Sequence, residues 1–147
     1  MQANIDFRQL VQALGDGVIV CDAKGDITFW NAAATRIFGF AESEAIGQSL
    51  DLIVPQRQRD RHWDGYHKTM ASGQTRYGAD LLRVPALHKE GKPLSIAFTV
   101  ALLHGADGEV SAIVALVRDE TERWNEERKL KARVAQLETA QGQGVAG

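Results

Sequence analysis

Three strand-like runs in the C-terminal half of the chain constrain its fold most. They cover 77–87, 94–103 and 110–118. The turns between them, 89–93 and 105–108, carry the Gly, Pro and Asp residues typical of hairpins. The middle run alternates large and small residues, as a strand with one buried face does, and its large members are Ile96, Phe98, Val100 and Leu102. Because such short turns permit only antiparallel pairing, these runs predict an antiparallel sheet.

The N-terminal half adds two more strands and several helices. Two apolar runs, 18–22 and 26–30, flank the turn Ala23-Lys24-Gly25 and predict another hairpin. Helical patterns cover 7–14, 32–38 after Asn31 as N-cap, 56–72 between Pro55 and Gly73, and 120–141. The expected fold class is α+β, a five-stranded antiparallel sheet with helices on one face, an N-terminal helix and a long C-terminal helix.

The 147 residues suffice for one domain. We expect an N-terminal amphipathic helix over 1–15, a core over 16–119, a C-terminal helix over 120–141 and a flexible Gly-rich tail over 142–147. In the C-terminal helix, Leu130, Val134 and Leu137 follow a four-then-three spacing, a fragment of a coiled-coil seam.

Composition excludes several classes of function. The net charge of −2 offers no basic field for direct nucleic-acid binding. There is no signal peptide and no apolar stretch long enough to span a membrane, so we expect a cytoplasmic protein. The one cysteine, Cys21, lies in an apolar run and is expected to be a buried, inert thiol. No phosphate-binding loop, HExxH or kinase signature occurs, so we expect no enzymatic activity.

Four segments in order resemble the PAS domain family. They are Gly25 to Ala34, Phe38-Gly39-Phe40 with Glu44 to Gly47, His88 to Lys92, and Arg118 to Arg123. The likeness covers about residues 5 to 124. It implies a PAS fold and a sensory domain of bacterial type that passes a signal through its C-terminal helix to a downstream output domain or partner protein.

Residues 55–91 resemble, more narrowly, the heme-binding PAS domains of bacterial oxygen-sensing histidine kinases and of carbon-monoxide-sensing transcription regulators. This resemblance implies heme b, with His62 as the proximal ligand of the iron. It also places Leu82 where oxygen sensors carry a distal Arg, with Arg83 one residue later, so the chain departs from the oxygen sensors at the group that stabilises bound oxygen. Other implied contacts are Lys68 and Arg76 near the propionates, and Phe98 and Val100 on the distal side. Residue chemistry adds Ile113 and Leu116 as further lining of an apolar slot, and Tyr66 as a stacking side chain.

Other interpretations remain open. His62 is equally compatible with a helix residue of no special role, and Phe98 and Val100 with simple core filling. Non-covalent FAD is an alternative cofactor, whereas flavin adduct chemistry is not expected because Cys21 lies on the first strand. A cofactor-free PAS module for dimerisation, protein interaction or small-ligand binding is the competing class.

For signal relay, the resemblance points to the end of the last strand. Asp119 and Thr121 lie at the hinge to the output helix, and we expect Asp119 to contact Arg123 or nearby backbone. We expect a parallel homodimer through the N- and C-terminal helices, formed by Phe7, Leu10, Leu14, Leu130, Val134 and Leu137.

Overall fold

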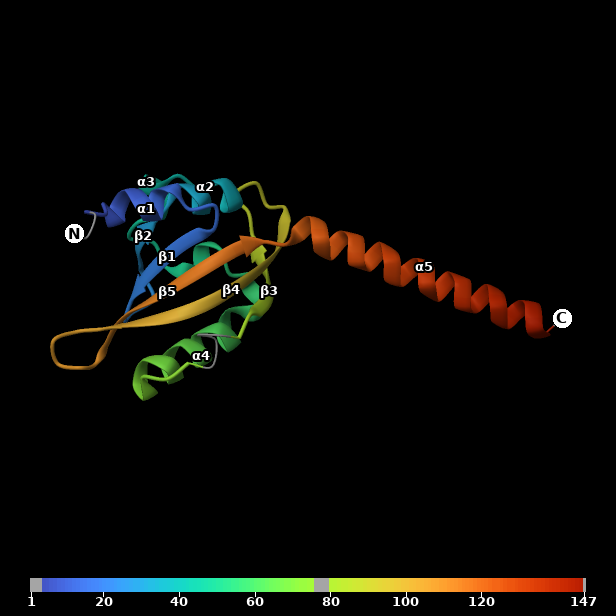
Figure 1. Ribbon diagram of the computed structural model, residues 1–147. Coiled ribbons are helices and arrows are strands. Elements are labelled where there is room, and N and C mark those ends of the chain that lie inside the picture. The colour runs from blue at the N-terminus through green and yellow to red at the C-terminus, as the bar shows by residue number, and fades with distance from the viewer. Residues whose placement is uncertain (1–3, 76–79, 147) are drawn as a thin grey trace.

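The computed structural model describes residues 4–75 and 80–146. Its centre is one five-stranded antiparallel sheet in the order β2-β1-β5-β4-β3, seen in Figure 1. The strands are β1 (Gly17–Asp22), β2 (Ile27–Trp30), β3 (Leu82–Leu87), β4 (Pro93–His104) and β5 (Val110–Asp119). Both predicted hairpin regions are present, and β1 pairs with β5, which joins the two halves of the chain in one sheet.

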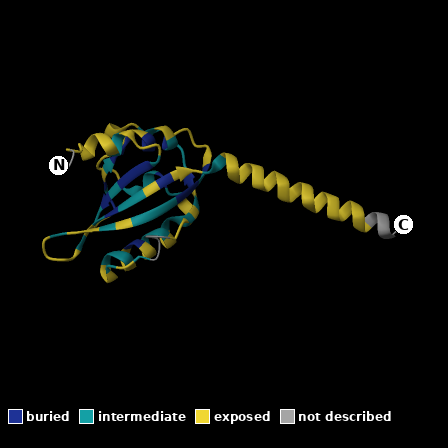
Figure 2. Cartoon of the chain, in the orientation of Figure 1, coloured by how far each residue is buried: buried dark blue, intermediate teal, exposed yellow. Residues whose placement is uncertain are grey.

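The helices between β2 and β3 are α2 (Ala32–Phe38), α3 (Glu42–Ala45) and α4 (Arg59–Ser72). Two 3-10 turns, η1 (Leu50–Leu52) and η2 (Gln56–Gln58), connect α3 to α4. The terminal helices are α1 (Phe7–Ala13) and α5 (Thr121–Ala146). Figure 1 shows α5 extending away from the domain as a single arm, and Figure 2 shows that this arm is exposed over 122–142. The predicted α+β fold is confirmed.

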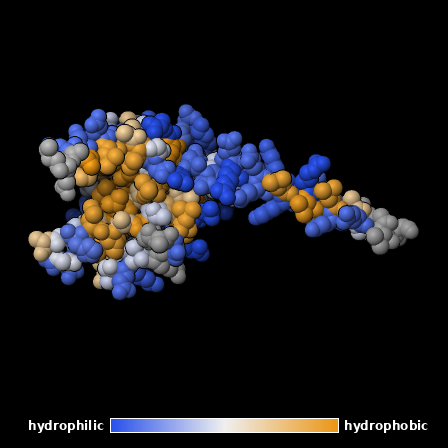
Figure 3. Space-filling view, in the orientation of Figure 1, coloured by the Kyte–Doolittle hydropathy of each residue, from blue (hydrophilic) through white to orange (hydrophobic). Residues whose placement is uncertain are grey.

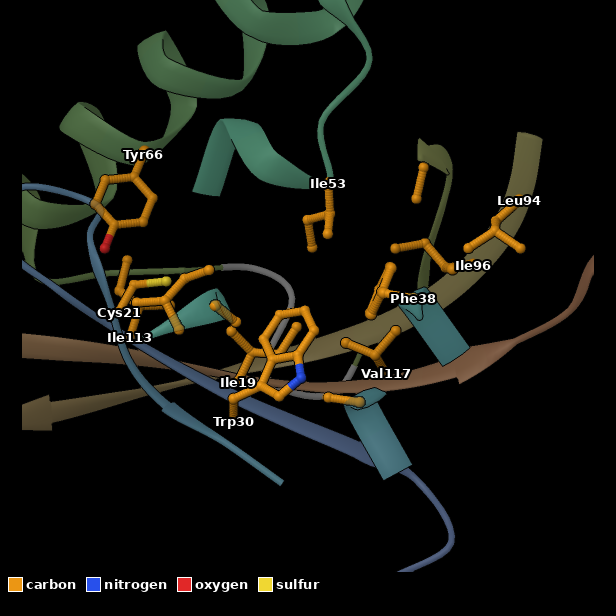
Figure 4. Packing of buried hydrophobic residues seen from close by; sticks show 14 residues of the cluster. Ile19, Cys21, Trp30, Phe38, Ile53, Tyr66, Leu94, Ile96, Ile113 and Val117 are labelled. Atoms are coloured by element: carbon orange, nitrogen blue, oxygen red, sulfur yellow. The ribbon is translucent and has the colours of Figure 1, made fainter. Parts of the chain in front are cut away.

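The core lies between the inner face of the sheet and the helices. Strand residues Ile19, Cys21, Ile113 and Val117 meet Trp30, Phe38, Ile53 and Tyr66 there, and Figure 4 shows these side chains converging. The alternation along β4 places Ile96, Phe98, Val100 and Leu102 on this inner face, as predicted. Apolar side chains in period two therefore set which face of the sheet is buried.

Two element boundaries differ from the prediction. β3 begins at Leu82, five residues after the expected start at Tyr77, and residues 76–79 lie outside the described part. α5 continues to Ala146 instead of ending near Gln141. Gly142 and Gly144 each cost only about 1 kcal/mol in a helix, and no proline stands in this stretch of the sequence to end it.

Candidate functional site

The candidate site lies where α4 covers the inner face of the sheet. η2 follows Pro55, and α4 ends at Gly73, whose backbone is left-handed (φ 68°). Two side chains fasten α4 to the β1–β2 hairpin. The Tyr66 hydroxyl donates to the Asp22 carbonyl at 2.5 Å. Trp63 packs its ring on Gly25, and its Nε1 donates to Asp51 Oδ1 at 2.8 Å.

His62 lies one turn before Tyr66 on the same side of α4. Its ring packs edge-on against Trp63, with the ring centroids 4.7 Å apart, and lies 5.9 Å from Tyr66. The Nδ1 atom is buried and has no hydrogen-bond partner. Burial lowers the pKa of His62, and the Asp51 carboxylate opposes this shift. The lowered pKa favours the neutral imidazole, the form that coordinates a metal.

The sheet side of the site is apolar. Ile113 belongs to the buried core, and Phe98 and Val100 pack against it from β4. Leu82 of β3 pairs with Phe98 and therefore lies on the same face. These four predicted lining residues do come together on the inner face.

Leu116 does not line the site, and its assignment was wrong. It lies three residues after Ile113 in β5, so the pleat turns it to the outer face, where it is 40% exposed. Residues of one strand that are separated by an odd number of positions point to opposite faces of the sheet, so Ile113 and Leu116 cannot line the same site.

Of the two cations predicted to contact the propionates, Lys68 and Arg76, only Lys68 lies among the described residues. Lys68 is exposed on α4 and lines an open depression at the C-terminal end of that helix, together with Thr69, Ser72 and Leu102. Arg76, the second predicted cation, lies outside the described residues.

Side chains fill the space between α4 and the sheet. Tyr66 is 7% exposed and points toward Cys21 and Ile113 (Figure 4), while Met70 packs against the same cluster. The site thus presents a neutral imidazole at one edge of an apolar layer that is closed in this conformation.

The predicted relay residues form a second cluster at the start of α5. Asp119 Oδ1 accepts from the Thr121 backbone N–H at 2.9 Å and from the Thr121 hydroxyl at 2.5 Å. The same hydroxyl oxygen accepts from the Ser95 N–H at 3.0 Å, and the Glu120 N–H donates to the Ser95 carbonyl at 2.8 Å. The expected backbone contact of Asp119 is present.

The expected pair of Asp119 with Arg123 is not formed, and Arg123 instead pairs with Glu127 at 3.3 Å and with Glu120 at 3.8 Å. Sequence reasoning missed Ser95. It lies 26 residues before Thr121, and only the pairing of β4 with β5 brings the two together.

Comparison with known proteins agrees with this geometry. Residues 5–119 match a family model described as the PAS fold. The solved PAS domain of a Colwellia psychrerythraea protein superposes with a TM-score of 0.69 at 20% identity, covering 79% of this chain and 95% of that one.

Two relatives are sensor proteins. The sensor protein FixL of Bradyrhizobium diazoefficiens is 40% identical over 60 residues, which are 41% of this chain and 12% of FixL. The oxygen sensor protein DosP of Escherichia coli is 25% identical over 103 residues, which are 70% of this chain and 13% of DosP. This chain thus spans about an eighth of either relative.

Proposed function

Because the chain belongs to the PAS family, we propose that it is a sensory domain that binds heme b through His62 and relays the state of the heme through α5. The observation that carries this proposal is the half-buried imidazole of His62, with a buried Nδ1 and a lowered pKa, at the edge of an apolar layer. The likeness of residues 55–91 to heme-binding PAS domains, and the relation to an oxygen sensor protein, support it.

The residues present fit the chemistry of that cofactor. His62 offers a nitrogen ligand, the wall of Phe98, Val100 and Ile113 suits an apolar ring, and Lys68 stands at the open end of α4 for a carboxylate. A bound heme would supply a redox-active, gas-binding iron. Because Tyr66 and Met70 fill the layer, binding requires α4 to move outward from the sheet.

The relay would run along β4 and β5. Phe98 and Val100 belong to the same strand as Ser95, whose backbone is bonded to Thr121 and Glu120. A shift of β4 at the site would therefore change the support of the first turn of α5. Such a shift transmits a signal only when the ligand binds one of the two arrangements more tightly.

We further infer a parallel homodimer, because α1 and α5 expose their apolar stripes. Phe7 and Leu10 are 70% and 47% exposed, and Leu130, Val134 and Leu137 are 52–64% exposed. Figure 3 shows hydrophobic atoms over the domain and again on α5, on the same side of the molecule.

The charges beside the α5 seam favour the parallel arrangement. The seam places Leu130 and Leu137 at heptad position d and Val134 at position a. Position g is then occupied by Glu126 and Arg133. Position e is occupied by Lys131 and Glu138. In a parallel pair in register, each g residue faces the e residue five positions later in the second copy. Both resulting pairs, Glu126 with Lys131 and Arg133 with Glu138, join opposite charges.

The test is the absorption spectrum of the protein expressed with excess heme precursor, compared with His62→Ala and His67→Ala. His67 is an exposed histidine of the same helix and serves as the matched control. A Soret band that is lost in His62→Ala and kept in His67→Ala supports the proposal. A band kept in both variants contradicts the assignment of His62, and a flavin spectrum indicates a redox sensor instead.

A cofactor-free PAS module for dimerisation or partner binding is the second candidate. The filled layer beneath α4 favours it, since no repacking is then required. A colourless protein that cannot be reconstituted with heme would establish this candidate over the first.

A further inference from the structure

Two buried polar side-chain atoms, one in α4 and one in the residue just before it, lack a hydrogen-bond partner. They are Nδ1 of His62 and Oε1 of Gln58, and they are the two such side-chain atoms found among the residues described. An unpaired buried polar atom is destabilising, because it has lost its water without gaining a partner. Because the two residues lie one helical turn apart, each of these atoms is a candidate hydrogen-bond partner for the other.

The backbone places both side chains on one side of the helix. Gln58 is the N-cap position of α4 and has helical backbone angles (φ −96°, ψ −4°). Residues four apart in such a segment are neighbours on its surface. The Gln58 side chain does not cap the helix, and its Oε1 has no partner.

The nearby carboxylate of Asp51 does not bond to His62 Nδ1. Its Oδ1 accepts from Trp63 Nε1 at 2.8 Å and lies 3.7 Å from Arg59 Nε. Gln58 Oε1, which is buried and unpartnered on the same helix face, is therefore our candidate acceptor for a hydrogen bond from His62.

We propose that Gln58 is a positioning residue for His62: the two side chains are not bonded in this conformation, and a rotation that brings them together lets the His62 Nδ1–H donate to Gln58 Oε1. This inference rests on the proposed heme site. An amide oxygen accepts only, so the pair requires the proton on Nδ1 and leaves the lone pair on Nε2 for a ligand. A hydrogen bond of this kind orients a metal-binding imidazole and raises its basicity.

The first test is the tautomer of His62 in the cofactor-free chain, read by long-range proton–nitrogen NMR at pH 8. The four histidines are distinguished by the cross-peaks lost in His62→Gln. We expect the Nδ1–H tautomer in the native chain and in Gln56→Leu, and a mixture in Gln58→Leu. Gln56 is exposed in the preceding turn and is the matched control.

An Nε2–H tautomer in the native chain, as arises when the Gln58 amide nitrogen donates to Nδ1, overturns the proposal. So does a tautomer that Gln58→Leu leaves unchanged. This measurement needs no cofactor, so its result stands even when heme fails to bind and the proposed function fails.

The second test uses the heme-loaded protein. Gln58→Glu places a stronger acceptor on Nδ1, so we expect a higher iron–histidine stretching frequency in the Raman spectrum and a lower reduction potential. Gln58→Leu shifts both in the opposite direction. Values equal to those of the native protein in both variants contradict a contact between Gln58 and His62.

Discussion

Asn31 uses all four hydrogen-bonding positions of its side chain although it is 1% exposed. Oδ1 accepts from the N–H groups of Val18 and Ala34, and Nδ2 donates to the carbonyls of Val11 and Asp16. One amide thus joins the end of α1, the start of β1 and the first turn of α2.

Asn31→Asp keeps the shape of the side chain and removes both donors. We expect the free energy of unfolding in urea to fall by about 2 kcal/mol, because two part-buried carbonyls lose their donor and a buried carboxylate replaces the amide. Asn125→Asp, on the exposed part of α5, is expected to stay within about 0.5 kcal/mol of the native chain. Equal losses in the two variants would show that the network does not hold the fold together.

Cys21 is buried on β1, and its burial, followed by the charges of Asp22 and Asp26, raises its pKa from 9.0 to about 12. Three pKa units lower the thiolate fraction roughly a thousandfold at pH 8. We expect iodoacetamide to alkylate the folded chain far more slowly than the chain in urea. Ser43→Cys in a Cys21→Ala background, an exposed thiol, should react rapidly while folded. Rapid reaction of native Cys21 would contradict its burial.

The raised pKa of Cys21 also makes the stability of the fold depend on pH. Because the folded pKa of Cys21 lies above the unfolded one, its contribution to the unfolding free energy is complete below pH 9. That contribution declines as the pH rises from 9 toward 12, and in Cys21→Ala this part of the decline should be missing.

At the scale of elements, the attachment of α4 to the β1–β2 hairpin depends on a glycine. A Cβ at Gly25 would lie 2.2 Å from the Trp63 ring, whereas one at Gly91 meets nothing within 4 Å. Both glycines have positive φ, 90° and 83°, so alanine carries a similar backbone strain at either site.

Gly25→Ala should therefore be less stable than Gly91→Ala by about 1–3 kcal/mol, the usual cost of overpacking. Thermal or urea unfolding of the two variants gives this difference directly. If both lose the same amount, the cost is backbone strain alone and Trp63 does not press α4 onto the hairpin.

The start of α5 depends on the Thr121 hydroxyl, which accepts from the Ser95 N–H and donates to Asp119. Thr121→Val removes this bridge between β4 and the helix. We expect faster amide hydrogen exchange in the first turn of α5 and an unfolding free energy lower by about 1 kcal/mol. Thr139→Val removes a hydroxyl that bonds to Ala135 in the exposed middle of α5. It should leave exchange in the first turn unchanged, and an equal effect of both variants would refute the bridge.

At the scale of the whole molecule, the exposed apolar seam of α5 (Leu130, Val134 and Leu137) predicts pairing with the same helix of a second copy of the chain. Val134→Asp places a charge within the seam, while Ala135→Asp adds the same charge beside it. We expect the native chain and Ala135→Asp to sediment as dimers at tens of micromolar, and Val134→Asp to sediment as a monomer. A native chain that is monomeric under these conditions disproves the homodimer.

The helices of the described part of the chain include none long and apolar enough to cross a membrane.

Features that depend on neighbours along the chain could be predicted from local patterns. The order of strands and helices, the turn around Gly25, the cap at Asn31 and the seam of α5 follow from spacing and turn chemistry, which act within a few residues. The inner face of β4 was also predictable, because its alternation is regular.

Contacts between distant segments were decided only by the tertiary structure. The register of β5 turned Leu116 to the outer face, and the pairing of β4 with β5 brought Ser95 to Thr121. Trp63 meets Gly25 only because α4 folds back over the hairpin. Gln58 and His62 are close in sequence, yet their missing partners became visible only once burial had removed water from both. Register and burial are properties of the assembled sheet and its helices, so no local pattern specifies them.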